Sequence, residues 1–467
     1  MTSSEQPPTN RYLSGNFAPV NKEVTVTNLP VEGTLPTHLD GRYLRNGPNP
    51  ISVVDPPTYH WFLGDGMVHG IRLRDGKAEW YRNRWVRSSG VAEAFGEEPH
   101  PGPTNNGFDF GANTNVIGHG GRTFAIVEAG PNPYELTDEL DTIGPCDFDG
   151  TLGGGWSAHP HRDPRTGELH TVSYHWAWGN KVRYSVLDRV GKVTKLVEVQ
   201  TTGAPMVHDC AITASSIVIY DLPTVLSVEA AIAGASLPYR WDNDYPARVG
   251  LLARDGDGTD MQWFDVDPCY VFHTLNAFDD GDKVVLDLVR HKRMFATDFN
   301  GPNEGIPTLE RWTLERESGK VHTTVLAEGG HEFPRIDERV FGSSHRYGYT
   351  IGIGFDAGES EGEGSPQAVG FENTLYRHDI VQGTTTARSF GAGSSVGEFV
   401  FVPNSPDSPE DDGVLMGFSH DPISDTSRLE VVDAQTLESV AAVQLPVRVP
   451  VGFHGNWVPT TELSRLA

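Results

Sequence analysis

The sequence predicts an all-β protein built as a β-propeller. Strand–turn–strand patterns recur along the 467 residues, 52 glycines and 33 prolines are spread over the whole length, and amphipathic helical patterns are scarce. Alternating apolar and polar residues are typical of half-buried antiparallel strands, with glycine and proline in the turns between them. Hairpins that recur along a chain indicate radial repetition, which is how propellers protect their sheet edges.

The hairpin pattern is clearest in five segments. These are GIRLRDGKAEWYRNRWV from Gly70, YSVLDRVGKVTKLVEV from Tyr184, ERWTLERESGKVHTTVL from Glu310, LYRHDIVQGTTTARSF from Leu375 and LEVVDAQTLESVAAVQL from Leu429. A repeat of roughly 60 residues would divide the chain into seven blades. The main helix candidate is AAIAGASLPYRW from Ala230.

The sequence also predicts where the propeller domain begins. We expect residues 1–20 to form a flexible N-terminal arm and residues 21–467 to form a single seven-bladed propeller domain. The acidic stretch Phe355–Gln367 is expected to be an exposed loop.

Composition excludes several classes of function. A formal net charge of −27 argues against a nucleic-acid partner, because phosphate binding needs clustered Lys and Arg. Three cysteines, Cys146, Cys210 and Cys269, are too few for a disulfide framework. The first residues, MTSSEQPPTNRYLSG, lack the pattern of a signal peptide, and no apolar run approaches the ~20 residues of a membrane helix. We therefore expect a cytoplasmic protein, with a peripheral membrane contact left open and no protein partner implied.

Six buried-looking polar residues recur at blade spacing. They are His159, His208, His273, Glu332, Glu398 and His454. Their intervals of about 49 to 66 residues are close to one blade each. Because the innermost strands of a propeller surround its axis, one residue per blade would converge on a central site. Imidazoles suit borderline metal ions, and carboxylates often accept the second N–H of a ligating imidazole.

Other interpretations of these residues stay open. Any single histidine is more often a satisfied core or turn residue than a ligand. A zinc site through His208-Asp209-Cys210 and Cys269-x₃-His273 lacks the paired spacing of structural zinc sites. Asp65 and Asp209 are interpreted as residues that satisfy backbone groups in turns.

At these residues the chain resembles the carotenoid cleavage oxygenase family, which includes apocarotenoid oxygenases, stilbene-cleaving dioxygenases and the retinal pigment epithelium isomerase. The matching segments are GRYLRNGPNP (41–50), HWFLGDGMVHG (60–70), NTNVIGHGGRTFAIVEAG (113–130), AHPH, FHTLN, EFPRID, PNSPDSPEDDGVL (403–415) and FHGNWVP. The resemblance implies a seven-bladed catalytic propeller whose active-site face is covered by a dome of loops and helices.

The resemblance also implies a set of site residues. The iron ligands would be His159, His208, His273 and His454, and the carboxylate partners Glu128, Glu332 and Glu398. Glu128 lies outside the blade-spacing series and rests on the motif alone. His161 shares a strand face with His159, but the motif favours His159 as the ligand. The implied cofactor is Fe(II) with O₂ as co-substrate, and no organic cofactor is implied.

The implied activity is oxidative cleavage of a conjugated C=C bond into two carbonyl products. Stilbene-cleaving members of the family resemble one another in carrying a lysine directly before the glutamate that corresponds to Glu128. In this chain the residue at that position is Val127. This favours an apolar carotenoid or apocarotenoid as the substrate. The alternatives are a stilbene- or phenylpropenoid-cleaving dioxygenase, and an inactive metal-binding propeller that serves as a binding module.

Overall fold

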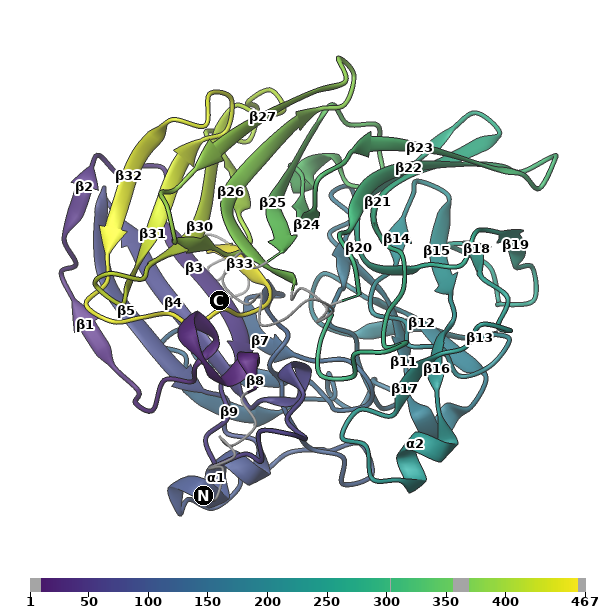
Figure 1. Ribbon diagram of the computed structural model, residues 1–467, viewed down its shortest axis with the longest axis horizontal. Coiled ribbons are helices and arrows are strands. Elements are labelled where there is room, and N and C mark those ends of the chain that lie inside the picture. The colour runs from purple at the N-terminus through teal and green to yellow at the C-terminus, as the bar shows by residue number, and fades with distance from the viewer. Residues whose placement is uncertain (1–9, 303, 356–368, 461–467) are drawn as a thin grey trace, which may run out of the picture.

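The seven-bladed, all-β prediction is confirmed. The computed structural model describes residues 10–302, 304–355 and 369–460. Within them, seven sheets follow one another around a common axis, and a two-stranded ribbon, β16 (Thr224–Leu226) with β17 (Tyr239–Trp241), is inserted in the fourth (Figure 1). The expected acidic loop Phe355–Gln367 lies almost wholly outside the described residues.

The blades are numbered from the N-terminus, and their strands are given from the axis outwards. Blade 1 contains β33 (Gly455–Pro459), β3 (Gly41–Pro48), β4 (Gly66–Arg74), β5 (Lys77–Trp85) and β1 (Thr25–Thr27). Blade 2 contains β6 (Asn115–His119), β7 (Arg122–Ile126), β8 (Tyr134–Leu136) and β9 (Thr142–Pro145). Blade 3 contains β10 (His161–Arg162), β11 (Leu169–Tyr174), β12 (Lys181–Leu187) and β13 (Val193–Gln200). Blade 4 contains β14 (Ala211–Ile212), β15 (Ser216–Asp221), β18 (Arg248–Ala253) and β19 (Gln262–Asp265).

The remaining blades complete the ring. Blade 5 contains β20 (Tyr270–Asp280), β21 (Lys283–His291), β22 (Thr308–Glu315) and β23 (Val321–Ala327). Blade 6 contains β24 (His331–Arg335), β25 (Tyr347–Phe355), β26 (Val369–Asp379) and β27 (Thr384–Ser389). Blade 7 contains β28 (Ser395–Val396) and β29 (Val400–Pro403), both paired with β30 (Gly413–Asp421), then β31 (Thr426–Asp433), β32 (Ser439–Gln444) and β2 (Val31–Gly33).

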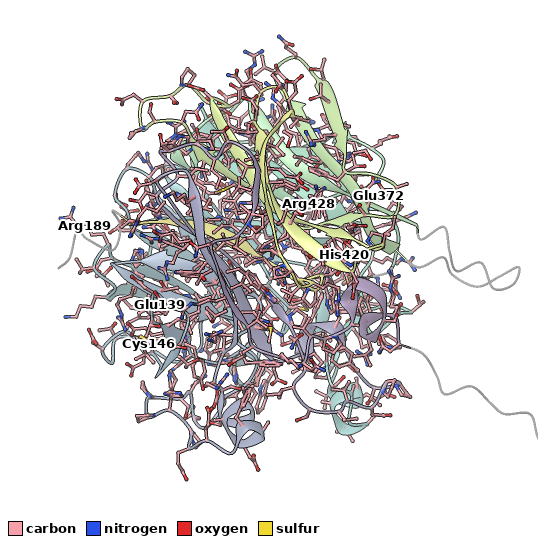
Figure 2. All side chains as sticks on the ribbon, turned by 90° about the vertical axis from the view of Figure 1, so that its left-hand side faces the viewer. Glu139, Cys146, Arg189, Glu372, His420 and Arg428 are labelled. Atoms are coloured by element: carbon pink, nitrogen blue, oxygen red, sulfur yellow. The ribbon has the colours of Figure 1, made fainter. Side chains whose placement is uncertain are left out.

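Each end of the chain completes the blade that the other end begins. The last strand, β33, pairs with β3, and the early strand β2 pairs with β32. In Figure 1 the purple N-terminal strands therefore lie beside the yellow C-terminal ones. Figure 2 views this junction from the side, with His420 of β30 and Arg428 of β31 labelled on blade 7. The two exchanged strands close the ring with backbone hydrogen bonds from both ends of the sequence.

The hydrophobic core lies between neighbouring blades. One cluster joins blades 1 and 7 through buried residues such as Tyr43, Ile71, Met416 and Leu429. A second joins blades 3 and 4, and a third joins blades 4 and 5. Burial of apolar surface stabilises such packing by about 25 cal/mol per Å². The core therefore fixes each blade against the next around the axis.

All five predicted hairpins are confirmed. In blades 3, 5 and 6 they are the two outermost strands, and in blades 1 and 7 only the short strands β1 and β2 lie outside them. The clear alternation in these segments reflects their position, because an outer strand has exposed side chains between its buried ones. In β13, for example, Glu198 is exposed between the buried Val197 and Val199. Inner strands such as β20 and β24 are buried over most of their length and carry no such pattern.

The long loops gather at one face of the ring. They connect β3 to β4, β5 to β6, β15 to β18 and β21 to β22, and they carry α1 (Ser89–Phe95), α2 (Val228–Ile232) and the short 3₁₀ turn η3 (Trp61–Leu63). Two further 3₁₀ turns are η4 (Trp176–Trp178) and η5 (Glu338–Val340). Over the described parts of the chain, no helix is both long and apolar enough to cross a membrane.

The helix expected from Ala230 to Trp241 is wrong over most of its length. Ser227 caps α2, but the helix ends after Ile232, and residues 239–241 form β17. Gly234 has φ +82°, a left-handed conformation that ends helices. In residues 233–241 the local turn and the pairing of β16 with β17 therefore outweigh helical propensity.

Of the flexible arm expected over residues 1–20, the first nine residues lie outside the described residues and the rest can be described. Residues 10–17 form the 3₁₀ turns η1 (Arg11–Leu13) and η2 (Gly15–Phe17). The side chain of Asn10 donates to the carbonyls of Pro56 and Tyr59, and the ring of Tyr12 stacks on Trp61 with centroids 5.3 Å apart. Aromatic packing thus holds this segment against the covered face.

Ring closure generates a stability prediction at Gly33, the last residue of β2. Its φ is +76°, and a Cβ there would overlap the carbonyl oxygen of Val440 in β32. Gly33→Ala should lower the free energy of unfolding by about 1–3 kcal/mol more than Gly319→Ala does. Gly319 is the matched control, because its φ is +69° and it has no atom within 4 Å of a Cβ. Chemical denaturation measures both variants, and equal losses would show that the β2–β32 pairing is not restrictive.

Candidate metal centre

Four histidines meet at the axis where the inner strands begin. His159 lies two residues before β10 and His208 three residues before β14, His273 lies near the start of β20, and His454 directly precedes β33. One ring nitrogen from each lies within 4.8 Å of all the others. The structure thus brings together the four histidines that the sequence selected.

The spacing of the ring nitrogens fits one metal ion. The Nε2 atoms of His159 and His208 are 2.9 Å apart, and those of His273 and His454 are 3.1 Å apart. At a metal–imidazole distance of about 2.1 Å, two ligands at a right angle are separated by about 3.0 Å. The four nitrogens can therefore surround a single ion without rearrangement.

Three of the histidines have a carboxylate at the opposite ring nitrogen. The Nδ1 atoms of His208, His273 and His454 face Glu128 at 2.5 Å, Glu332 at 2.5 Å and Glu398 at 3.1 Å, respectively. Glu332 and Glu398 accept the Nδ1 protons of His273 and His454, so the Nε2 atoms of these two rings are left with lone pairs that point to the centre. The Glu128–His208 contact is close but lacks the geometry of a hydrogen bond. The lone pairs of His273 and His454 would repel each other at 3.1 Å, and a cation between them removes that repulsion.

His159 differs from the other three histidines. Over residues 10–302, 304–355 and 369–460, no carboxylate pairs with its ring. Burial and the three neighbouring histidines hold the pKa of His159 well below its usual value. Burial likewise lowers the pKa of His454 to about 4. Both rings are therefore neutral, which is the form that ligates metal ions.

Glu332 and Glu398 stay ionised although they are buried. For Glu398, burial raises the pKa, but Arg335, the imidazole of His454 and the backbone N–H of Gly455 together lower it to about 2. The Arg335 Nη1 atom lies 3.4 Å from Glu398, and the Gly455 nitrogen 2.8 Å. For Glu332, burial also opposes ionisation, and His273 and His291 bring the pKa below its usual range.

Sequence reasoning missed three residues that support these carboxylates. His291 Nε2 lies 2.6 Å from Glu332 Oε1, the Tyr174 hydroxyl donates to Glu128 Oε1 at 3.0 Å, and Arg335 pairs with Glu398. Only Arg335 was in a recognised motif, EFPRID. His291 and Tyr174 lie on second strands, β21 and β11, where blade spacing carries no signal for the axis.

Asp209 links three of the histidine-bearing segments. It follows His208, its Oδ2 accepts the Thr274 N–H beside His273 at 2.7 Å, and its Oδ1 lies 2.7 Å from the Nε2 of His161. The expected role of Asp209 in satisfying backbone groups is confirmed. His161 points to this carboxylate, and it is His159 that belongs to the four-histidine group. Asp65 likewise accepts the N–H of Ile51 at 3.0 Å.

The zinc interpretation is not supported by the arrangement of the thiols. Cys210 groups with His161 and Asp209, while His208 and His273 belong to the four-histidine group. Cys269 is in neither group, within the described residues. All three cysteines are buried free thiols.

An apolar cavity opens onto the histidines from the covered face. Its wall includes Trp61, Phe62, Phe272, Phe333, Phe371 and Phe453. Val127, Glu128 and the three histidines His208, His273 and His454 also line it, and Tyr12 and Phe17 of the N-terminal segment complete the wall. The cavity, called the apolar tunnel below, presents an apolar surface beside the four-histidine group.

The fold and the site define a class of protein: a seven-bladed propeller whose axis carries a four-histidine group able to hold a metal ion, beside an apolar tunnel. The family model described as retinal pigment epithelial membrane protein matches residues 17–459. A carotenoid cleavage oxygenase from Mycobacterium tuberculosis is 47% identical over 499 residues, covering 97% of this chain and 98% of the relative. The chain belongs to the carotenoid cleavage oxygenase family.

Solved structures agree with this assignment. Lignostilbene dioxygenase from Pseudomonas brassicacearum superposes with a TM-score of 0.85 at 29% identity, covering 97% of this chain and 99% of that one. Cobalt-substituted Synechocystis apocarotenoid oxygenase superposes with a TM-score of 0.83 at 26% identity, covering 95% and 97%. The chain is therefore similar to proteins named for two different substrate classes.

The carboxylate partners generate a prediction about metal affinity. Glu332→Gln should weaken metal binding about 10–100-fold, because an amide polarises His273 and fixes its tautomer less well than a carboxylate. Glu310→Gln is the matched control, since Glu310 is a buried glutamate of the neighbouring blade 5 that bonds Trp312 instead of a histidine. Competition with a chelator measures both affinities; equal losses in the two variants would contradict the role of Glu332.

Proposed function

We propose that the protein is an Fe(II)- and O₂-dependent dioxygenase that cleaves a conjugated C=C bond of a carotenoid or apocarotenoid into two carbonyl products. The observation that carries this proposal is the apolar tunnel that ends at four converging imidazoles. The extended similarity to the mycobacterial carotenoid cleavage oxygenase supports the substrate class.

Iron fits the donor set. Four neutral imidazoles suit borderline divalent ions and leave the ion its full charge, with up to two positions open. When bound, Fe(II) would supply O₂ activation. Both oxygen atoms enter the two carbonyl products as the C=C bond breaks, so no external reductant is needed.

The protein's own residues hold the geometry. Glu332 and Glu398 fix two imidazoles in one tautomer and Glu128 lies against a third, so the metal would not have to reorient these ligands. The aromatic wall excludes water and aligns a long polyene by surface contact. The position of the polyene along the tunnel then selects the double bond placed beside the metal.

The tunnel favours an apolar substrate over a phenol. Among the described residues that line it, none is a lysine or arginine, and Val127 is buried beside Glu128. A phenolate would enter without a cationic partner, whereas a polyene needs none.

A stilbene or phenylpropenoid substrate is the second candidate. The structural similarity to lignostilbene dioxygenase favours it, and the Tyr174 hydroxyl at Glu128 is a polar group at the tunnel wall. A third candidate, an inactive metal-binding propeller, would bind the ion without O₂ uptake.

Metal content tests the centre first. Purified protein should carry about one iron per chain, and His454→Ala should lose most of it, because removal of one of four ligands opens the ion to water. His420→Ala on blade 7 is the control, since His420 is buried and bonds Asp425 away from the centre. Elemental analysis gives the result, and wild-type iron content in His454→Ala would refute the ligand assignment.

Substrate choice is tested by product analysis of the iron-loaded protein. A long apocarotenal should give two carbonyl fragments, and hydroxystilbenes should be poor substrates. Val127→Lys should weaken apocarotenal cleavage at least about tenfold, because it places a desolvated charge beside an apolar chain. Val127→Leu, which keeps the wall apolar, should retain activity. Efficient hydroxystilbene cleavage by the wild type without apocarotenal turnover would favour the second candidate and leave the metal centre intact.

A further inference from the structure

We propose that a second, polar cavity on the propeller axis is the route by which a hydrated divalent metal ion reaches the four histidines. The inference rests on the proposed metal centre and not on the identity of the organic substrate. The cavity, called the polar channel below, is lined by His159, His273, His454 and residues that follow them along the inner strands.

Strand direction separates the two cavities. The inner strands begin beside the covered face, so residues that precede or adjoin a histidine on that side, such as Phe272 and Phe453, line the apolar tunnel. Residues further along the same strands, such as Thr274 and Asn456, line the polar channel. The two cavities share His273 and His454, so they meet at the metal site from opposite sides.

The polar channel reaches the outside of the molecule. His454 at its inner end is 3% exposed, whereas the Glu338 side chain in η5, at its outer end, is 45% exposed. Ile117, Arg162 and Pro459, all partly exposed, lie on the walls. A small hydrated species can therefore follow the axis from solvent to the imidazoles.

Of the species that take part in the proposed reaction, only the metal ion is strongly hydrated and so suits a polar route. The polyene, its carbonyl products and O₂ are weakly hydrated and suit the apolar tunnel. A divalent cation would lose its hydration against aromatic walls, at a desolvation cost of several kcal/mol per ion. The reaction consumes no proton and needs no external reductant, so the metal ion is the only strongly hydrated participant.

The channel offers a cation suitable oxygen and nitrogen donors. His161 and Asp209 face each other on its wall, 2.7 Å apart, and Glu338 lies at the mouth. Arg335 carries a positive charge, but it is offset by Glu338 at 2.6 Å and Glu398 at 3.4 Å. The His161–Asp209 pair would thus bind the cation transiently on its way from solvent to the four histidines.

The rate of metal uptake tests the route. Glu338→Cys places a thiol at the channel mouth, and a bulky thiol reagent will modify it selectively because Cys146, Cys210 and Cys269 are buried. Metal-free protein is mixed with Co²⁺, and the absorbance of the bound ion is followed with time. The modified variant should bind Co²⁺ at least about tenfold more slowly than the same variant before modification, with the same final amount bound.

Two controls locate the effect. Modified Glu317→Cys, in the exposed turn between β22 and β23, and modified Leu237→Cys, at the wall of the apolar tunnel, should both bind Co²⁺ at their unmodified rates. Unchanged uptake in modified Glu338→Cys, or slowing in modified Leu237→Cys alone, would overturn the route. Failure of the wild type to bind Co²⁺ would overturn the metal centre as well, whereas failure to cleave apocarotenals with normal uptake would overturn only the proposed reaction.

Discussion

The hydrogen bond between a buried carboxylate and an imidazole is the interaction on which the site depends. Glu332 and Glu398 each hold one histidine in this way, and Glu128 lies 2.5 Å from a third. Ionised carboxylates are stable at the buried axis only if positive charge balances them. Arg335 supplies one positive charge beside Glu398, and a divalent ion held by the histidines would supply two more. Metal binding and the folding of the axis would therefore be coupled electrostatically. Without an ion, burial lowers the pKa of His273, but the Glu332 carboxylate raises it by more. A proton on His273 would then supply part of the positive charge that the ion would otherwise provide.

The propeller supplies the positions that these hydrogen bonds then refine. Inner strands of neighbouring blades are in contact around the axis, including β14 with β20, β20 with β24, and β29 with β33. The fourth ligand, His454, depends on ring closure, because it directly precedes the strand that completes blade 1. Its N–H donates to Thr114 of blade 2, and its carbonyl accepts from Asn46 of β3. Joining the chain ends and completing the coordination sphere are thus one structural event.

The sequence predicted the parts of this arrangement that follow a period. The ligands and Glu332 and Glu398 recur at blade spacing, and the outer hairpins show strand alternation because one face of each is exposed. Glu128 was predicted as a site residue only from its motif, since it follows the second strand of its blade and lies outside the blade spacing. The role of His291 could not be predicted from a motif or from spacing. Its position beside Glu332 results from strand register within blade 5 and from packing against blade 6. Long-range packing also explains two departures from what the sequence led us to expect. Tyr12, expected in a flexible arm, stacks on Trp61, which is distant in sequence. Most of the helix expected from Ala230 is replaced by a turn and the β16–β17 ribbon.

The backbone couples the metal site to the apolar tunnel at two of the three glutamates. Ala129 follows Glu128 with φ 64°, and Phe333 follows Glu332 with φ 50°. Left-handed backbone at non-glycine residues costs of order 1–3 kcal/mol and persists where the surroundings enforce it. At Phe333 this conformation turns the backbone N–H onto Glu332 at 2.5 Å. It also places the ring against His273 and His454, with centroids 5.2 Å and 5.0 Å away. Because the Glu332–Phe333 pair both polarises His273 and forms the tunnel wall, the proposed substrate would act directly on the histidines if it displaced that wall. The polar channel shares only His273 and His454 with the wall, so under the proposed route the ion and the organic substrate would approach the same point without competing for a path.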